Sequence, residues 1–288
     1  MPDFRRVATL SIPLENLRRD LRTRLESDKQ MSGAWAIVPL LPTIVGIVVI
    51  AIVLAVIFSA LANIPRTPTP TNSTITTVAP LIAALFGALI LALLTYYILI
   101  ILVIILIFKL VSRRNNHFNR QILLQEDLVS MARELAAKKE VDVSILLNNM
   151  ERGVREARLE EIEKNATLYA VVGGLVWIYA AYFLMKDFFK HERREDLFIN
   201  DMLRTFNALG VPINFPYRNP PIPDRSFALY FVLTLITGNI FGVYWVYVLV
   251  TDPNNHFRQQ MLMEDTIMAQ LSSTSPPPPS PIPSAPTT

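Results

Sequence analysis

Cysteine is absent from this chain of 288 residues, and histidine occurs only three times. Without cysteine the chain has no disulfides, no thiolate metal ligands and no thiol nucleophile. Charged residues make up 18% of the chain against 52% hydrophobic residues, and the mean hydropathy is +0.37. A soluble domain of this length is usually more polar, so the composition predicts an integral membrane protein.

The sequence also lacks the short motifs of common enzyme classes. It has no Gly-Lys-Ser/Thr phosphate loop, no Gly-x-Ser-x-Gly elbow, no His-Glu-x-x-His helix and no protein-kinase motif set. Its 27 basic and 24 acidic residues are mostly intermingled, so the net charge of +3 does not mark a nucleic-acid surface. We therefore expect no enzymatic activity, no cofactor and no nucleic-acid partner.

Four long apolar runs predict an all-α membrane protein with about four transmembrane helices. About 20 apolar residues in a helix cross a hydrocarbon core of roughly 30 Å. Spans one and two, residues 35–62 and 79–111, form a hairpin around an outer loop at 63–78. Spans three and four are residues 167–185 and 227–250. We expect helix breaks at the glycines of spans three and four: Gly173, Gly174, Gly238 and Gly242.

The predicted regions alternate between membrane and cytoplasm. In chain order they are a cytoplasmic amphipathic segment (1–34), the transmembrane hairpin (35–111), a cytoplasmic helical region (112–166), membrane repeat unit one (167–205), a proline-rich linker (206–224), membrane repeat unit two (225–270) and a disordered proline- and serine-rich tail (271–288). Leucines at helical spacing in residues 14–27 fit either a helix on an anionic membrane surface or one packed on its own protein. The 112–166 region predicts a helical hairpin and coiled-coil self-association.

Basic residues predict the orientation, because lysine and arginine near span ends resist translocation. Residues 1–34 hold seven of them, residues 112–166 hold ten and the loop at 63–78 holds one, which places the N-terminus in the cytoplasm. Four full spans would put residues 186–225 outside, although that segment holds seven. We prefer the four-span arrangement. In the alternative, spans three and four break at their glycines and return to the side from which they entered.

The chain contains an internal repeat. A shift of 65 residues superposes the third span on the fourth: Gly173 on Gly238, Tyr179 on Tyr244, Tyr182 on Tyr247, Asp187 on Asp252 and His191 on His256. The tetrapeptide Asn-Asn-His-Phe occurs at residues 115–118 and again at 254–257, so a third copy ends span two. Asn116 and Asn255 are expected to cap the helices that follow.

The stretch from Thr237 to Tyr247, TGNIFGVYWVY, resembles the signature Thr-x-Gly-Ile-Tyr-Gly-Ile-Tyr-Trp-x-Tyr of a family of small prokaryotic membrane domains of unknown function. A fainter copy lies at residues 172–182. Asn239 and Phe241 depart from the signature. The resemblance implies location in a prokaryotic cell membrane and implies no activity. Aromatic side chains prefer the headgroup level, which predicts these interface anchors: Tyr179, Tyr182, Tyr244, Trp245 and Tyr247.

The three histidines, His117, His191 and His256, occupy one repeated position. Brought together they could bind zinc or relay protons. The carboxylates further along the chain are candidate partners: Glu126, Asp127, Asp201, Glu264 and Asp265. Four full spans would put His191 on the side opposite the other two, and contact with lipid headgroups explains the histidines more simply. We therefore expect no metal ion.

These observations favour a non-enzymatic membrane protein that acts as a scaffold or assembly component through its cytoplasmic helices. Its expected partners are the lipid bilayer and either a second copy or another membrane protein. The alternative is a passive channel or small-solute transporter lined by Thr234, Thr237 and Asn239. The predicted spans hold no ionisable residue at mid-depth, which argues against active transport.

Overall fold

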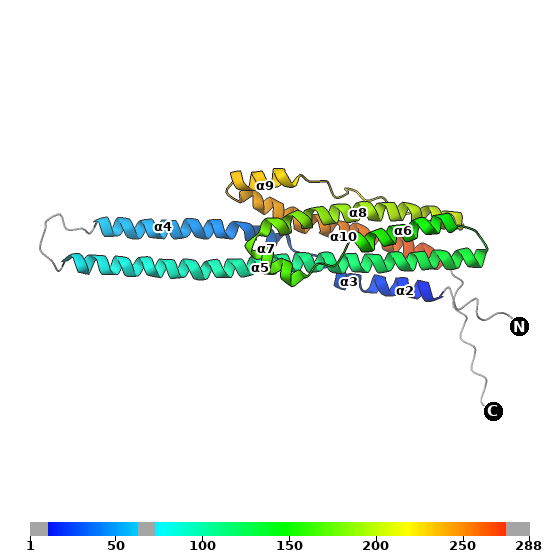
Figure 1. The fold of residues 1–288 in the computed structure, drawn as a ribbon, viewed down its shortest axis with the longest axis horizontal. Coiled ribbons are helices and arrows are strands. Elements are labelled where there is room, and N and C mark those ends of the chain that lie inside the picture. The colour runs from blue at the N-terminus through cyan, green and yellow to red at the C-terminus, as the bar shows by residue number, and fades with distance from the viewer. Residues whose placement is uncertain (1–10, 63–72, 275–288) are drawn as a thin grey trace, which may run out of the picture.

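The computed structural model describes residues 11–62 and 73–274, and every regular element in these two ranges is a helix. The helices form an elongated molecule in which a long hairpin projects from one end of a bundle (Figure 1). In chain order they are α2 (Ser11–Arg22), α3 (Arg24–Ser27), η1 (Gly33–Leu40), α4 (Leu41–Ala62), α5 (Ser73–Lys139), α6 (Ser144–Glu160), α7 (Ala166–Leu175), α8 (Trp177–Ala208), α9 (Phe227–Ile236) and α10 (Ile240–Thr274). Most of the predicted outer loop and tail lie outside the described residues.

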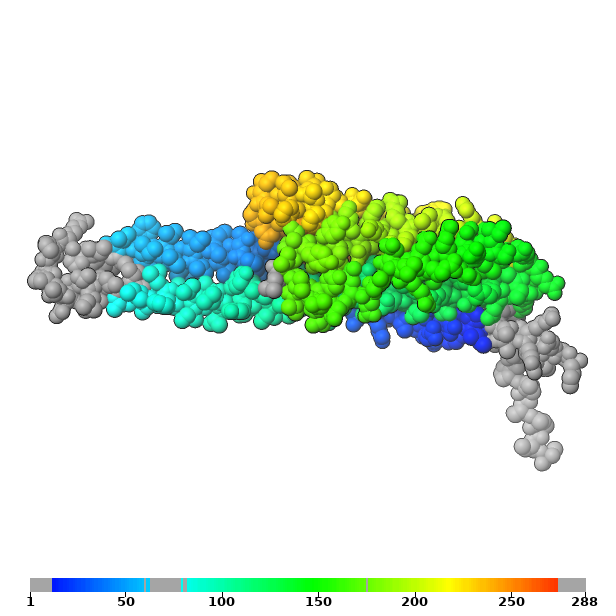
Figure 2. Space-filling view, in the orientation of Figure 1, coloured from blue at the N-terminus to red at the C-terminus, as the bar shows by residue number. Residues whose placement is uncertain are grey.

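The projecting hairpin consists of α4 and the first half of α5, as Figure 2 also shows. By length and composition, two stretches are able to cross a membrane: Gly33–Ser59 and Ile82–Lys139. Their most apolar windows are 0% and 17% buried inside the protein, so these side chains face the surroundings. At 1.5 Å per residue, the 67 residues of α5 extend about 100 Å. The half of α5 that follows Lys109 therefore projects beyond a hydrocarbon core of roughly 30 Å.

The predicted third and fourth spans are helical hairpins rather than continuous helices. α7 and α8 are separated at Val176, and the ring of Tyr169 before the break meets that of Phe183 after it edge-to-face, with centroids 4.9 Å apart. α9 and α10 are separated at residues 237–239. The ring centroids of Tyr230, before the break, and Trp245, after it, are 5.7 Å apart. The short arms α7 and α9 have 10 residues each. The prediction of four membrane-crossing helices is therefore not confirmed.

The predicted break at Gly173 and Gly174 falls slightly later in the structure: both residues lie in the last turn of α7, and the chain breaks at Val176. A Cβ atom at Gly173 would lie 2.8 Å from Cδ1 of Ile107, and one at Gly174 would lie 2.5 Å from Cγ1 of Ile104. These glycines lie where α7 crosses α5, and their missing side chains let the two helices touch.

The reversal between α9 and α10 contains one of the two remaining predicted breaks. Gly238 has φ +56° and Asn239 has φ +71°, a left-handed pair that turns the chain back. The side-chain amide of Asn239 donates to the carbonyl of Pro39 in η1. Gly242 lies within α10, so that predicted break is wrong; a Cβ there would overlap the side chain of Asn239.

α2 packs on its own protein and lies at the end of the bundle remote from the projecting hairpin (Figure 1). Leu14 and Leu17 are buried in a core that also contains Leu128 of α5 and Ile267 of α10. Of the two alternatives for the N-terminal helix, the structure shows the one in which it packs on its own protein. The same core is completed by α6, which begins at Ser144 and contacts both α5 and α8.

Candidate metal centre

Three units with the same plan surround the centre. Each has a polar cap residue, a short apolar helix, a reversal and a long helix that carries one histidine; in unit one, α4 extends the short helix into the membrane hairpin. The cap side chains of Ser32, Asn165 and Ser226 accept hydrogen bonds from the first turns of η1, α7 and α9. η1 contacts α10, α7 contacts α5 and α9 contacts α8, so each short helix packs on the long helix of another unit.

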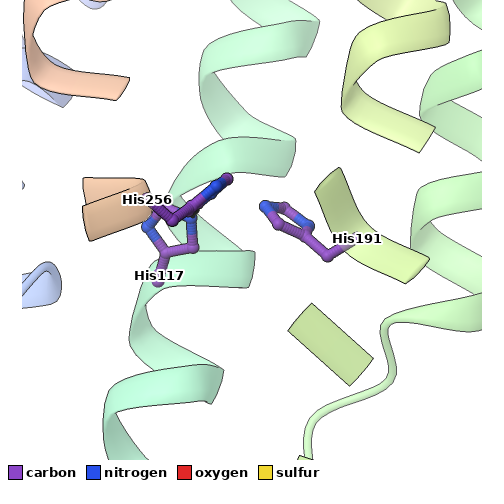
Figure 3. Close-up of side chains that lie close together, drawn as sticks. All are labelled: His117, His191 and His256. Carbon is purple, nitrogen blue, oxygen red and sulfur yellow. Dashed lines mark hydrogen bonds between the residues drawn. The ribbon is translucent and has the colours of Figure 1, made fainter. Parts of the chain in front are cut away.

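This arrangement brings the three histidines together. His117 of α5, His191 of α8 and His256 of α10 point toward one another in Figure 3. Nε2 of His117 lies 3.2 Å from Nε2 of His256, and one nitrogen of each ring lies within 4.8 Å of the others. The side chains are at most 1% exposed. The expectation that His191 lies opposite the other two is wrong, because α8 returns to the side from which α7 starts.

A buried carboxylate holds the outer nitrogen of each ring. Nδ1 of His117 lies 2.9 Å from Asp28, Nδ1 of His191 lies 3.0 Å from Glu161 and Nδ1 of His256 lies 2.9 Å from Glu192. Because an ionised carboxylate only accepts hydrogen bonds, each Nδ1 carries the hydrogen and each Nε2 keeps its lone pair. Histidines that ligate metals are oriented by this kind of outer partner.

The carboxylate of the third unit comes from a different position. Asp28 and Glu161 each lie four residues before the cap of their unit, where the third unit has Ile222. Glu192, the residue directly after His191, supplies the missing carboxylate: one oxygen accepts from Nδ1 of His256 and the other from the amide of Ile222 at 2.7 Å. All three imidazoles therefore receive equivalent partners from a repeat that is not identical in sequence.

The two Asn-Asn-His-Phe boxes lie inside long helices, so the prediction that Asn116 and Asn255 cap following helices is wrong. α10 continues through Pro253, which has no N–H and leaves the carbonyl of Leu249 without its helical donor. The buried guanidinium of Arg113 donates to that carbonyl at 3.1 Å. This contact replaces the missing helical hydrogen bond, so α10 continues through the position where the sequence predicted the start of a new helix.

The first asparagine of each box fastens a loop to a histidine-bearing helix. Asn115 donates to the carbonyl of Lys164 at 2.6 Å and accepts from its amide at 3.2 Å. Asn254 donates to the carbonyl of Met31 at 2.8 Å and accepts from its amide at 3.1 Å. Lys164 and Met31 each follow a histidine-bound carboxylate by three residues, so these amides fix the two carboxylate loops in place.

A fourth candidate ligand, Glu195, lies beside the rings. Its Oε2 is 3.7 Å from Nε2 of His191 and 3.6 Å from Nε2 of His256. The side chain is 3% exposed, and its ion-pair partner is Arg218, whose terminal nitrogen lies 2.5 Å away but outside hydrogen-bonding geometry. Arg218 also pairs with Asp196 at 2.6 Å. Among residues 11–62 and 73–274, Nε2 of His191 has no hydrogen-bond partner.

Charged side chains of both signs are buried around the rings. Five buried carboxylates lie in the cluster: Asp28, Glu161, Glu192, Glu195 and Glu264. Four guanidinium groups lie within ion-pair distance of them: Arg24, Arg120, Arg194 and Arg218. Arg24 and Arg218 are shared with the exposed Asp265 and Asp196. Arg113 and Arg114 are buried in the same region, and Arg114 interacts with Glu161, so the guanidinium groups are at least as numerous as the buried carboxylates.

Burial favours the neutral form of His117 and His256. Burial lowers the pKa of His117, which lies beyond the apolar part of α5, to about 4, and it lowers the pKa of His256 well below its usual value. Burial opposes ionisation of Glu161, but His191 and Arg194 outweigh it and lower that pKa to about 2. Burial raises the pKa of Glu195. Neutral imidazole is the form that binds metal ions.

The predicted interface anchors divide into two groups. Tyr179, Tyr182, Tyr244 and Tyr247 are each about half exposed. Trp245 is 0% exposed and packs between helices, so the prediction that it anchors the protein in the headgroup region is wrong. Its partners are other aromatic rings: Trp177, Phe227 and Tyr230.

Sequence reasoning found the histidines and missed their partners. Of the acids that follow the histidines, Glu126 pairs with Arg158, and Glu264 reaches the cluster only through arginine and glutamine side chains. The acids that hold the rings precede the short helices. An acid four residues before a helix cap, in units one and two, was the available signal.

No protein-family model matches this chain, and no curated protein or solved structure matches it at a significant level. The resemblance of residues 237–247 to a prokaryotic membrane family stays a prediction.

Proposed function

We propose that this chain is a membrane-anchored, non-enzymatic scaffold whose three units are locked together by one transition-metal ion, with Zn²⁺ as the first candidate. The observation that carries this proposal is the convergence of three buried imidazoles, each held at Nδ1 by its own carboxylate and each presenting Nε2 to the others. Within the part of the chain that the structure describes, Nε2 of His191 has no hydrogen-bond partner, which leaves its lone pair available to a metal ion.

The ligand set favours zinc. Imidazole nitrogen binds Zn²⁺ at about 2.0–2.1 Å, so two nitrogens on one tetrahedral ion lie about 3.3 Å apart. The separation of 3.2 Å between Nε2 of His117 and Nε2 of His256 fits that spacing, and His191, whose nitrogen lies within 4.8 Å of the others, has to approach by up to about 1.5 Å. Carboxylate oxygen is also a zinc ligand, and Glu195 would complete a closed set of four.

Burial supports a structural role for the ion rather than a catalytic one. A catalytic zinc ion keeps one position open for water or substrate, whereas a structural zinc ion is fully ligated by protein. The three imidazoles and Glu195 are each at most 3% exposed. Because the rings come from α5, α8 and α10, one ion would join all three units and stabilise their packing.

The membrane location rests on the α4–α5 hairpin. Its two helices are long and apolar enough to cross a bilayer, and the basic residues flank them on one side. The positive-inside rule then places the N-terminus and the metal centre in the cytoplasm. Helices α2, α6, α8 and α10 would form the cytoplasmic surface on which partners assemble.

The direct test is metal content. The full chain, purified in detergent after growth with zinc, is expected to hold about one zinc ion per chain by atomic emission. His191→Gln keeps a donor for Glu161 but removes the imidazole, and it is expected to lose the zinc while its circular dichroism stays helical. Asn119→Gln, two residues after His117 on α5, is the matched control and should keep the ion.

The binding of zinc should also stabilise the folded chain, because a ligand that binds only the folded state raises the melting temperature. Chelation is expected to lower the Tm of the wild-type protein and to leave that of His191→Gln unchanged. A wild-type chain that holds no zinc and gains no stability when zinc is added would overturn the proposal.

A further inference from the structure

α7 and α9 present apolar side chains to the surroundings, although each helix has only 10 residues. Leu168 and Val171 of α7 are 57% and 49% exposed, and Leu235 and Ile236 of α9 are 63% and 75% exposed. Isolated exposed leucines are normal, but two short helices of this composition at the same end of the bundle (Figure 1) present apolar surface that needs a covering.

The tips of both hairpins lie beside the membrane-crossing stretches. Gly174, at the end of α7, lies against Ile104 of α5, and Asn239 at the start of α10 bonds to Pro39 at the base of α4. Ile104 lies five residues before Lys109, about 7.5 Å inside the apolar part of α5. Figure 1 shows α7 and α9 at the end of the bundle from which the α4–α5 hairpin projects. The apolar surface is therefore continuous with the membrane-facing surface of that hairpin.

The backbone at the α9–α10 reversal is satisfied within the protein, as lipid requires. The hydroxyl of Thr237 donates to the carbonyl of Leu233 at 2.7 Å and accepts from the amide of Phe241 at 2.9 Å. The amide of Asn239 donates to the carbonyl of Thr234 at 2.8 Å. A channel lined by Thr234, Thr237 and Asn239 would need these polar groups to face water, but they form hydrogen bonds within the turn.

Basic side chains lie at the bases of the two hairpins. Lys164 precedes α7, Lys186 lies in α8 beyond the reversal, and Arg225 precedes α9. Hairpins that return to their starting side put residues 186–225 on the same side as residues 112–166. The seven and ten basic residues of these two segments then share one side of the membrane, which removes the conflict between charge and the number of spans.

We infer that the chain crosses the membrane twice, through α4 and α5, and that the α7–α8 and α9–α10 hairpins dip into one leaflet without crossing. The partner of their exposed apolar faces is the acyl-chain layer of the cytoplasmic leaflet. A 10-residue arm is about 15 Å long, half of a hydrocarbon core of roughly 30 Å. The half-exposed Tyr182 and Tyr247, which are further from the tips, then lie nearer the headgroup level.

The depth of the tips is measurable, because the chain has no native cysteine. Ile236→Cys and Val176→Cys, each labelled with a fluorescent maleimide, are reconstituted in phosphatidylcholine and phosphatidylglycerol vesicles that contain lipids with a nitroxide on the acyl chain. Both labels are expected to lose most of their fluorescence, as a label at Leu54→Cys in α4 does. Leu197→Cys, equally exposed but in the cytoplasmic half of α8, should keep its fluorescence.

The side of each segment is tested with an impermeant maleimide. Ile145→Cys in α6, Leu197→Cys in α8 and Leu262→Cys in α10 are expected to react from the same face of sealed vesicles. Reaction of positions 145 and 197 from opposite faces would overturn the inference, because it requires a full crossing. Unquenched labels at both tips would also overturn it and would indicate water or a second protein as the covering. Neither readout depends on metal.

Discussion

His117 and His256 face each other through the same ring atom, with Nε2 3.2 Å from Nε2. Each ring already donates through Nδ1 to a carboxylate, so two lone pairs point at one another when both imidazoles are neutral. Such a contact is repulsive unless a cation or a shared proton lies between the nitrogens. The separation matches two ligands of one zinc ion, so metal binding would turn this contact into an attractive one.

The carboxylate that holds His256 comes from Glu192 and not from position 222. Its role can therefore be tested by moving a carboxylate from position 192 to position 222. Glu192→Gln is expected to weaken zinc binding about 10–100-fold, because the outer partner of a metal-bound histidine contributes that much. Adding Ile222→Glu places a carboxylate at the position that Asp28 and Glu161 occupy in the other units. The double variant should regain part of the lost affinity, measured by competition with a chromophoric chelator.

Ile222→Gln in the same Glu192→Gln background is the matched control for that rescue. It changes the size and polarity of the side chain and adds no charge. Equal affinities for the Glu and Gln versions of the double variant would show that position 222 does not face His256 as the repeat implies.

Much of the fold follows from composition, and the path of the chain through the membrane does not. The 27-residue and 58-residue apolar stretches were recognisable because no charge interrupts their apolar parts. The residues of α7 and α9 have the same composition as a true span. What turns α9 back is the left-handed pair Gly238 and Asn239 and the bond from Asn239 to Pro39, some 200 residues earlier. Local patterns carry little information on such a contact.

The candidate site, like the fold, could be predicted from the sequence only in part. The repeat identified His117, His191 and His256 as equivalent positions, and equivalence around three packed units is what brings them together. The prediction of four membrane crossings concealed this convergence, because it places His191 on the side of the membrane opposite His117 and His256. Glu195 and Arg218 carried no sequence signal, since neither belongs to a repeated position that the comparison of spans made visible.

Glu195 is expected to be the fourth ligand of the ion. Glu195→Gln should weaken zinc binding by about 100-fold or more, since loss of an outer partner alone costs about 10–100-fold. With Co²⁺ in place of zinc, the visible absorption should change as water enters the coordination sphere. Asp196→Asn is the control, because Asp196 also pairs with Arg218 but is 42% exposed. An unchanged cobalt spectrum in Glu195→Gln would exclude Glu195 from the ligand set.

The packing of α2 on α5 is expected to weaken as the pH rises through about 6. Burial and the neighbouring Asp20 raise the pKa of Asp127, in the half of α5 that follows Lys109, to about 6, while Asn16 and Arg19 oppose the shift. Because the folded pKa exceeds the unfolded value near 3.8, the protonated carboxyl stabilises the fold most below pH 4. That contribution is lost between pH 4 and about 6.

Asp127→Asn removes this titration. Relative to the wild type, the variant should slow hydrogen exchange in α2 at pH 7 and have little effect near pH 4. Glu126→Gln removes one charge from the adjacent position, which pairs with Arg158 of α6 rather than with α2, and separates the effect on α2 from a general change in charge. A variant whose exchange difference from the wild type is the same at both pH values would contradict the assignment.

Gly174 is expected to be the position of α7 at which a larger side chain is tolerated least. A Cβ atom there would lie 2.5 Å from Cγ1 of Ile104, whose branched side chain has little freedom to move away. Gly174→Ala should therefore destabilise the chain in detergent by about 1–3 kcal/mol, even though alanine favours a helix by about 0.5–1 kcal/mol. Gly87→Ala in α5, with nothing within 4 Å, should be neutral or stabilising. If the two variants have equal Tm values, α7 does not touch α5 in the membrane.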